Sequence, residues 1–189
     1  MARPSIGTSD DVAARKVNIF LLLGFSACQQ PEIPVVELDP IVAQVDTVAV
    51  YLWHNRWQCE GNGCADEGAV RRIAGQIRAV SDRHKLPVST MVGVLMVENP
   101  WLDTLAVSYA GAIGLYQVMP MHRSAWLCKG SMESVSGSVC RGGAILADMI
   151  QRHGSERAGL LGYNGCRSAY CQDYHGKVAE RSEQFLNIE

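Results

Sequence analysis

Residues 97–120 read VENPWLDTLAVSYAGAIGLYQVMP, and Glu98 is the ionisable side chain that stands out in this stretch. It ends a segment, Met91–Val97, that would be apolar on nearly every side of a helix. Apolar surroundings disfavour a charged carboxylate, so they raise the pKa of a carboxyl group towards the range of a general acid. Alternatively, a glutamate at a helix end simply reaches water. Glu98 is therefore a candidate acid, and its sequence neighbours must decide between the two interpretations.

The residues after Glu98 resemble the signature of the soluble-lytic-transglycosylase family. That signature is a glutamate followed by A-V-S-x-x-G-A-x-G-L-M-Q-V-M-P. The chain matches it at Ala106, Val107, Ser108, Gly111, Ala112, Gly114, Leu115, Gln117, Val118, Met119 and Pro120. Further on, GYNG at residues 162–165 is similar to the A-Y-N-x-G element of the family, and Tyr174–Val178 is similar to the segment that follows it. The chain departs from the family at Asn99, where Ser is usual, and at Tyr116, where Met is usual.

The resemblance, which covers roughly Val70–Leu186, implies a lysozyme-like α-helical fold. It also implies cleavage of the β-1,4 bond between N-acetylmuramic acid and N-acetylglucosamine in peptidoglycan, with Glu98 as the catalytic residue. Protonated Glu98 would donate to the glycosidic oxygen. Its carboxylate would then take the proton of the muramic acid C6 hydroxyl, which closes a 1,6-anhydro ring without water. One carboxyl group suffices for this reaction, whereas ordinary glycosidases use two.

The resemblance further implies five substrate-binding residues along the sugar groove, namely Ser108, Tyr116, Gln117, Tyr163 and Asn164. Other interpretations remain open, since Ser108 can cap a helix, Gln117 can be solvated and Tyr163 can be a core aromatic. Trp101 can either stack on a sugar ring or belong to the core.

Asp103 is the other acid close to Glu98 in sequence. If it lay across the cleft, the site would suit a muramidase or chitinase-like hydrolase with two carboxyl groups. A third interpretation is a non-catalytic envelope protein that binds peptidoglycan without turnover.

Apolar residues recur at helical spacing along most of the chain after residue 40. This periodicity predicts helices over the ranges 41–57, 66–82, 89–98, 113–119, 143–152, 155–163 and 177–186. Ser89 is a candidate N-cap for the third of them. Sustained alternation of apolar and polar residues is absent, which leaves little room for a sheet. The sequence therefore predicts an all-α domain over residues 41–189.

Residues 1–27 have the organisation of an export signal. Arg15 and Lys16 precede a short apolar stretch that ends in small residues directly before Cys28. The Ser-Ala-Cys ending resembles a bacterial lipobox, which implies cleavage before Cys28 and acylation of its thiol; a buried helix is the alternative. Residues 28–40 contain three prolines and three acids, which is typical of a tether. We therefore expect an exported protein of the periplasm or cell envelope, anchored to the membrane as a lipoprotein.

The other six cysteines lie between residues 59 and 171 in close sequential couples. This arrangement predicts the disulfides Cys59–Cys64, Cys128–Cys140 and Cys166–Cys171, because short glycine-containing loops close at low entropic cost. Fifteen connectivities are possible in principle. A metal site is the alternative interpretation, but no couple has the spacing of a zinc knuckle and the five histidines are scattered.

Composition excludes several other classes of protein. A hydrophobic share of 48% with 19% charged residues is ordinary for a globular domain, and no apolar run reaches the length of a membrane-spanning helix. A net charge of -2 without a basic cluster gives no electrostatic footprint for nucleic acid. Phosphate-loop, dinucleotide and HExxH motifs are missing, so no cofactor or metal is expected. The expected partner is the glycan strand of peptidoglycan.

Overall fold

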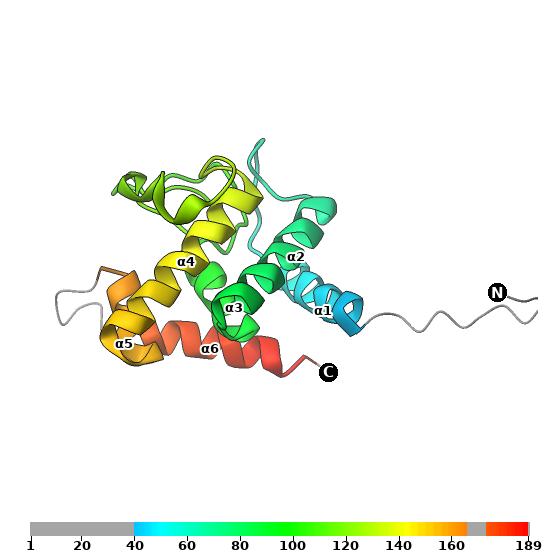
Figure 1. The fold of residues 1–189 in the computed structure, drawn as a ribbon. Helices are drawn as coiled ribbons and strands as arrows, with labels where there is room; N and C mark the ends of the chain where they lie inside the picture. Colours follow the sequence, from blue (N-terminus) through cyan, green and yellow to red (C-terminus); the bar gives the residue numbers. More distant parts are fainter. Residues whose placement is uncertain (1–39, 166–172, 189) are drawn as a thin grey trace, which may run out of the picture. The chain divides into compact units, whose positions relative to one another are not determined.

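The computed structural model describes residues 40–165 and 173–188, and almost all of its regular structure is α-helical (Figure 1). The helices are α1 (Pro40–Asn55), α2 (Glu67–His84), α3 (Val88–Glu98), α4 (Val135–His153), α5 (Glu156–Tyr163) and α6 (Tyr174–Leu186), with short 3-10 helices η1 (Pro120–His122) and η2 (Ala125–Leu127). Within these residues there is no strand, and β-pairing is limited to three isolated bridges. The all-α class predicted from the sequence is confirmed.

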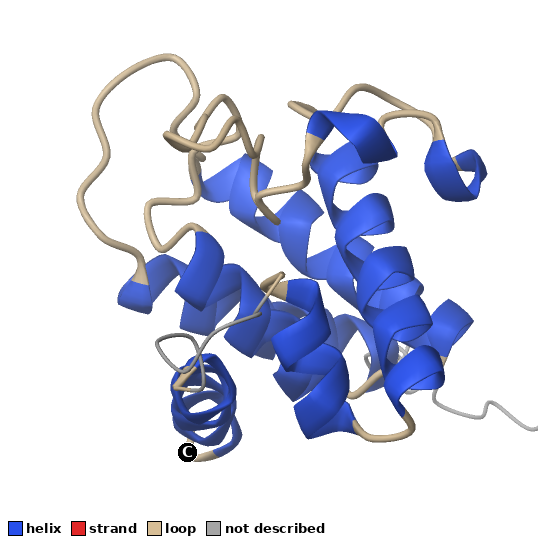
Figure 2. Ribbon diagram, turned by 90° about the vertical axis from the view of Figure 1, so that its left-hand side faces the viewer, coloured by secondary structure: helices blue, strands red, loops and turns tan. Residues whose placement is uncertain are grey.

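The helix α3 is the most buried element, as its uniform apolarity predicts. Every residue from Thr90 to Met96 is buried. Its most extensive packing is against α6 (Figure 1), the helix that ends near the C-terminus marked in Figure 2. Gly93 permits this approach, because a Cβ built there would lie 2.6 Å from the backbone oxygen of Val178 in α6. The α3–α6 pair therefore depends on a residue without a side chain at their crossing.

Polar caps fix the beginnings of three other helices. Asp66, Ser134 and Ser155 precede α2, α4 and α5, and each side chain accepts a hydrogen bond from a backbone N–H of the first turn. Such caps satisfy donors that have no partner inside the helix. α2 and α4 then pack closely where Gly143 meets Val80, since a Cβ at Gly143 would lie 2.2 Å from Val80 Cγ1.

The predicted helix over residues 113–119 is wrong, because this segment forms a compact loop. Gly111 and Gly114 have φ of +85° and +75°, which interrupt any helix. Isolated bridges pair Ile113 with Val107 on one side and Val118 on the other. The apolar spacing that suggested a helix reflects side chains folded inward from these turns.

Three helix boundaries also differ from the prediction. α3 begins at Val88 behind Pro87 and has no side-chain cap, so Ser89 does not cap it. α4 begins at Val135 instead of residue 143, because Ser134 caps it and the small residues that follow remain helical. α6 begins at Tyr174 instead of residue 177.

Two of the three predicted disulfides are formed. Cys59–Cys64 closes the loop between α1 and α2, and Cys128–Cys140 ties the segment before α4 to that helix. The predicted pair Cys166–Cys171 lies outside the described residues, as do Cys28, the export signal and the tether up to residue 39. In the part of the chain that is described, no helix has the length and apolarity needed to cross a membrane.

Candidate active site

Glu98 is the last residue of α3 and lines a cavity of about 380 Å³. The other walls come from the loop after residue 107 and from the end of α5. The lining residues are Glu98, Ser108, Ala110, Ala112, Gln117, Met119, Tyr163, Asn164 and Gly165. Five of the six catalytic and substrate-binding residues predicted from the sequence thus meet at one cavity. The sixth, Tyr116, does not line it.

Two opposing effects act on the Glu98 carboxyl group. Burial raises its pKa to about 7, because little water remains to solvate the charge. The hydroxyl of Tyr174 donates a hydrogen bond of 2.6 Å to Glu98 Oε1, and this bond lowers the pKa by favouring the carboxylate. The balance leaves a carboxyl group that titrates near neutral pH, where it can both donate and accept a proton.

Tyr174 is the site residue that sequence reasoning missed. It is the first residue of α6, and the packing of α6 against α3 places its hydroxyl on the end of α3. Burial, together with the charge of Glu98, raises the pKa of Tyr174 well above its ordinary value, so its hydroxyl keeps its proton as a donor. The only available signal was its place in the segment Tyr174–Val178 that resembles the family.

Tyr163 lies beside the same carboxyl group at the end of α5. Its hydroxyl donates a hydrogen bond of 2.7 Å to the backbone oxygen of Tyr116. Burial and the neighbouring charge of Glu98 raise the pKa of Tyr163 well above its ordinary value. The neutral ring therefore joins α5 to the loop that carries Gln117.

Tyr116 is not a groove residue, and the prediction that its side chain contacts sugar is wrong. The side chain is 0% exposed, and its hydroxyl donates a hydrogen bond of 2.9 Å to the backbone oxygen of Met91 in α3. Its ring packs on α4 at Gly142, where a Cβ would lie 2.4 Å from the ring. The Tyr116 side chain therefore anchors the loop in the core. Its contribution to the site is its backbone oxygen, which accepts the hydrogen bond from Tyr163.

Ser108 and Gln117 hold the cavity-lining loop in shape. Ser108 Oγ accepts a hydrogen bond of 3.0 Å from the backbone N–H of Ala112, so it caps a turn and not a helix. Gln117 donates from its side-chain amide to the backbone oxygen of Gly114 at 2.8 Å. Gln117 has a φ of +45°, which costs a non-glycine residue about 1–3 kcal/mol and is concentrated at functional sites.

Asn99 connects the end of α3 to the loop behind the cavity. Its side chain is 1% exposed, and its Nδ2 donates to the backbone oxygens of Asp103 at 2.7 Å and Gly114 at 3.2 Å. Its Oδ1 accepts from the backbone N–H of Asp103 at 3.2 Å. A serine here, as in the family, is too short to make all three bonds. Asn99 therefore holds the end of α3 against the backbone at Asp103 and Gly114.

Asp103 does not share the cavity with Glu98. Its Oδ1 accepts a hydrogen bond of 2.8 Å from the backbone N–H of Leu105, and its backbone forms an isolated bridge with Cys64. Among the described residues that line the cavity, Glu98 supplies the only carboxyl group. The arrangement therefore gives no support to a hydrolase with Asp103 as its second carboxylate.

The described residues contain no group of three or more His, Cys, Asp or Glu side chains that could hold a metal ion. The helical fold and a cavity with one carboxyl group of near-neutral pKa define a class of protein, a lysozyme-like α-domain equipped for acid–base chemistry.

A family model, the transglycosylase SLT domain, matches residues 76–184, and the chain belongs to this family. Members act on the cell wall, and membership implies a peptidoglycan substrate. The search of curated proteins found no match.

Proposed function

We propose that the protein is a lytic transglycosylase that cleaves the bond between N-acetylmuramic acid and N-acetylglucosamine and leaves a 1,6-anhydro end. The observation that carries this proposal is the Glu98 carboxyl group, which is unaccompanied by another acid among the described residues of the cavity, has a pKa of about 7 and accepts a hydrogen bond from Tyr174. One group that changes protonation near neutral pH can act first as acid and then as base.

In the first step, protonated Glu98 donates its proton to the glycosidic oxygen as the bond to the muramic acid C1 breaks. The leaving sugar departs with a new hydroxyl group, and the N-acetyl group of the substrate stabilises the cationic carbon. The Glu98 carboxylate that results is stabilised by the Tyr174 hydroxyl, which already donates to it in the free protein.

In the second step, the Glu98 carboxylate takes the proton of the muramic acid C6 hydroxyl, and that oxygen bonds to C1. The carboxyl group returns to its protonated state, and no water is consumed. Ser108, Gln117, Tyr163 and Asn164 line the same cavity and are the proposed contacts to the sugars.

We further propose that the domain works outside the cytoplasm, with residues 1–27 as the export signal and Cys28 as the acylated residue. The two disulfides formed within the described domain support an oxidising compartment. A tether over residues 28–40 would leave the domain free to reach the cell wall from its lipid anchor.

Purified sacculi incubated with residues 29–189 test the proposed reaction. We expect the released muropeptides to have masses lower by one water than those from a hydrolase, and we expect Glu98→Gln to release none. Reducing ends without anhydro products would favour the hydrolase. A wild-type protein that binds sacculi without releasing muropeptides would favour the non-catalytic interpretation.

A further inference from the structure

Two tryptophan side chains that do not line the Glu98 cavity are exposed together. Trp57 is 51% exposed and Trp101 is 43% exposed, and their rings meet edge to face with centroids 4.9 Å apart. Folding normally removes such large apolar rings from water, so two exposed rings in contact make this surface a candidate for ligand binding.

The pair is held in place by the backbone on both sides. The N–H of Trp57 donates a hydrogen bond of 2.8 Å to the oxygen of Pro100, the residue before Trp101. The Cys59–Cys64 disulfide closes the loop after Trp57, and an isolated bridge pairs Cys64 with Asp103. The indoles are thus presented in one fixed arrangement, which lowers the entropic cost of binding a ligand.

The exposed pair borders a depression of about 440 Å³, within the usual size range of ligand sites. It is lined by Trp53, His54, Arg56, Trp57, Gln58, Cys59, Glu60, Cys64, Ala65 and Trp101. Apart from the indoles, no large apolar side chain is present, and the rim offers both hydrogen-bond donors and acceptors. A pyranose has an apolar C–H face and a polar rim, and both match this combination of indoles with polar side chains.

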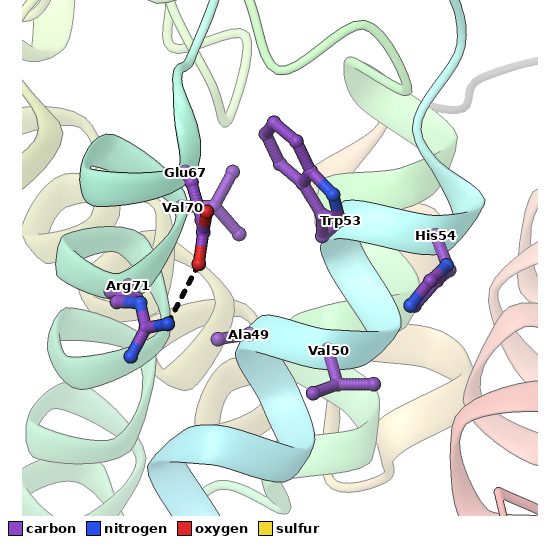
Figure 3. Close-up of a pocket in the computed structure, with 7 residues that line it drawn as sticks. All are labelled: Ala49, Val50, Trp53, His54, Glu67, Val70 and Arg71. Atoms are coloured by element: carbon purple, nitrogen blue, oxygen red, sulfur yellow. Dashed lines mark hydrogen bonds and ion pairs between the residues drawn. The ribbon is translucent and has the colours of Figure 1, made fainter.

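A second depression of about 470 Å³ adjoins the first, because Trp53 and His54 line both (Figure 3). It lies between α1 and α2, and Trp53 projects from α1 towards α2 across it. The guanidinium of Arg56 stacks on the Trp53 ring at 3.4 Å, which fixes the orientation of the ring. Exposed Glu67 and Arg71 form an ion pair of 2.7 Å at the far wall. The two depressions therefore adjoin at Trp53 and His54, and together they offer space for more than one ring of a sugar polymer.

We propose that this indole groove, defined by Trp53, Trp57 and Trp101, is a second carbohydrate-binding site that holds a glycan strand on the protein. Its ligand class is a β-linked chain of N-acetylated sugars, and this choice of polymer rests on the proposed function. The groove and the Glu98 cavity share no lining residue. Trp53 and Trp57 also lie before residues 76–184, the part of the chain that the family model matches.

A site of this kind changes how the enzyme meets its substrate. A strand held in the indole groove raises the effective concentration of neighbouring bonds at Glu98 without a new contact in the catalytic cavity. We therefore expect the groove to matter for intact sacculi and to be dispensable for short fragments that occupy only the catalytic cavity.

Binding is tested in a Glu98→Gln background, where turnover does not interfere. Trp57→Ala is expected to lower retention on sedimented sacculi at least fivefold, and Trp57→Phe, which keeps an aromatic face, to lower it less. Trp126→Ala is the matched control, because it removes a partly exposed indole outside the groove and should leave retention unchanged. Circular dichroism and a thermal melt establish that each variant is folded.

Intrinsic fluorescence gives a second measurement, since three of the four tryptophans belong to the groove. A soluble N-acetylglucosamine oligomer should shift the emission of the Glu98→Gln protein and of its Trp126→Ala variant, with a smaller shift after Trp57→Ala. Retention on sacculi within twofold of the parent after Trp57→Ala would overturn the proposal. That result would favour a protein as the ligand of the indole pair.

Turnover separates this proposal from the proposed function. With Glu98 intact, Trp57→Ala should slow the solubilisation of sacculi and leave the cleavage of short glycan fragments within twofold of wild type. An equal loss on both substrates would overturn a separate groove. If Trp57→Ala lost binding but wild type produced no anhydro ends, the groove would stand and the proposed reaction would fail.

Discussion

At the scale of single residues, the Glu98–Tyr174 pair sets the protonation of the site. The hydrogen bond from Tyr174 lowers the pKa of Glu98, opposing the rise caused by burial. Because the first step of the proposed reaction needs protonated Glu98, we expect activity to fall as pH rises through about 7.

Tyr174→Phe should move that alkaline limb to higher pH, since it removes the bond that favours the carboxylate. We also expect turnover to fall about tenfold or more, because the carboxylate formed in the proposed first step would lose its donor. A pH profile of sacculus solubilisation for both proteins measures the shift. A limb that stays in place or moves to lower pH would show that the tyrosine does not act on Glu98.

The same group couples stability to pH. The folded-state pKa of Glu98, about 7, is higher than its ordinary value of 4.5, so the folded state binds the extra proton between these values. Its stabilising contribution is complete below about pH 4.5 and is lost as the pH rises through 7.

Glu98→Gln should therefore be more stable than wild type at pH 8, by up to about 3 kcal/mol, because it no longer buries a charge. The gain should vanish towards pH 4.5. Urea unfolding of both proteins at the two pH values measures it. A constant difference between the proteins across this range would contradict a raised pKa at Glu98.

At the scale of elements, the site depends on the approach of α6 to α3. Gly93→Ala places a methyl group 2.6 Å from the Val178 backbone oxygen and 2.4 Å from Ser182 Oγ, so the helices must separate. We expect a loss of about 1–3 kcal/mol in the free energy of unfolding, as for other overpacked cores. Activity should fall as well, because α6 carries Tyr174.

Gly75→Ala in α2 is the matched control for this prediction. No atom lies within 4 Å of a Cβ built at Gly75, so the change should stabilise the helix by about 0.5–1 kcal/mol. Thermal melts of both variants make the comparison. Equal effects at the two positions would mean that the α3–α6 contact is not as tight as described.

The sequence predicted elements well where the periodicity was long. The predicted helices that became α1 and α2 are close to their observed bounds, because each has an uninterrupted apolar stripe. The error at residues 113–119 arose because a short apolar run cannot distinguish a helix from tight turns when glycines provide positive φ. The start of α4 was missed because Gly, Ser and Cys have weak helix propensity, and packing overrides it.

The site was predicted only in part, because a sequence shows local patterns but not contacts between distant segments. Glu98, Ser108, Gln117, Tyr163 and Asn164 were found from the family signature, and they meet at one cavity. The burial of Tyr116 and the role of Tyr174 could not be found, since each depends on a contact between segments far apart in sequence. The contact of the Tyr116 ring with Gly142 and the crossing of α3 with α6 produce no recognisable pattern in the neighbouring sequence.

At the scale of the whole molecule, the disulfides stabilise a small domain against unfolding. Cys128–Cys140 joins residues 12 apart, and closing a loop of this length contributes about 2–3 kcal/mol in the chain-entropy model. Cys128→Ser with Cys140→Ser should lower the midpoint of thermal unfolding by several degrees. Removing Cys59–Cys64 instead should also weaken retention on sacculi, because that bond borders the indole groove.

In the proposed reaction, ring closure by the C6 hydroxyl, and not attack by water, completes the cleavage at Glu98. The most direct test is digestion of sacculi by the wild-type protein in water enriched in oxygen-18, followed by mass spectrometry of the new muramic acid ends. We expect anhydro ends that carry no solvent oxygen. Reducing ends that each carry one oxygen-18 would contradict it.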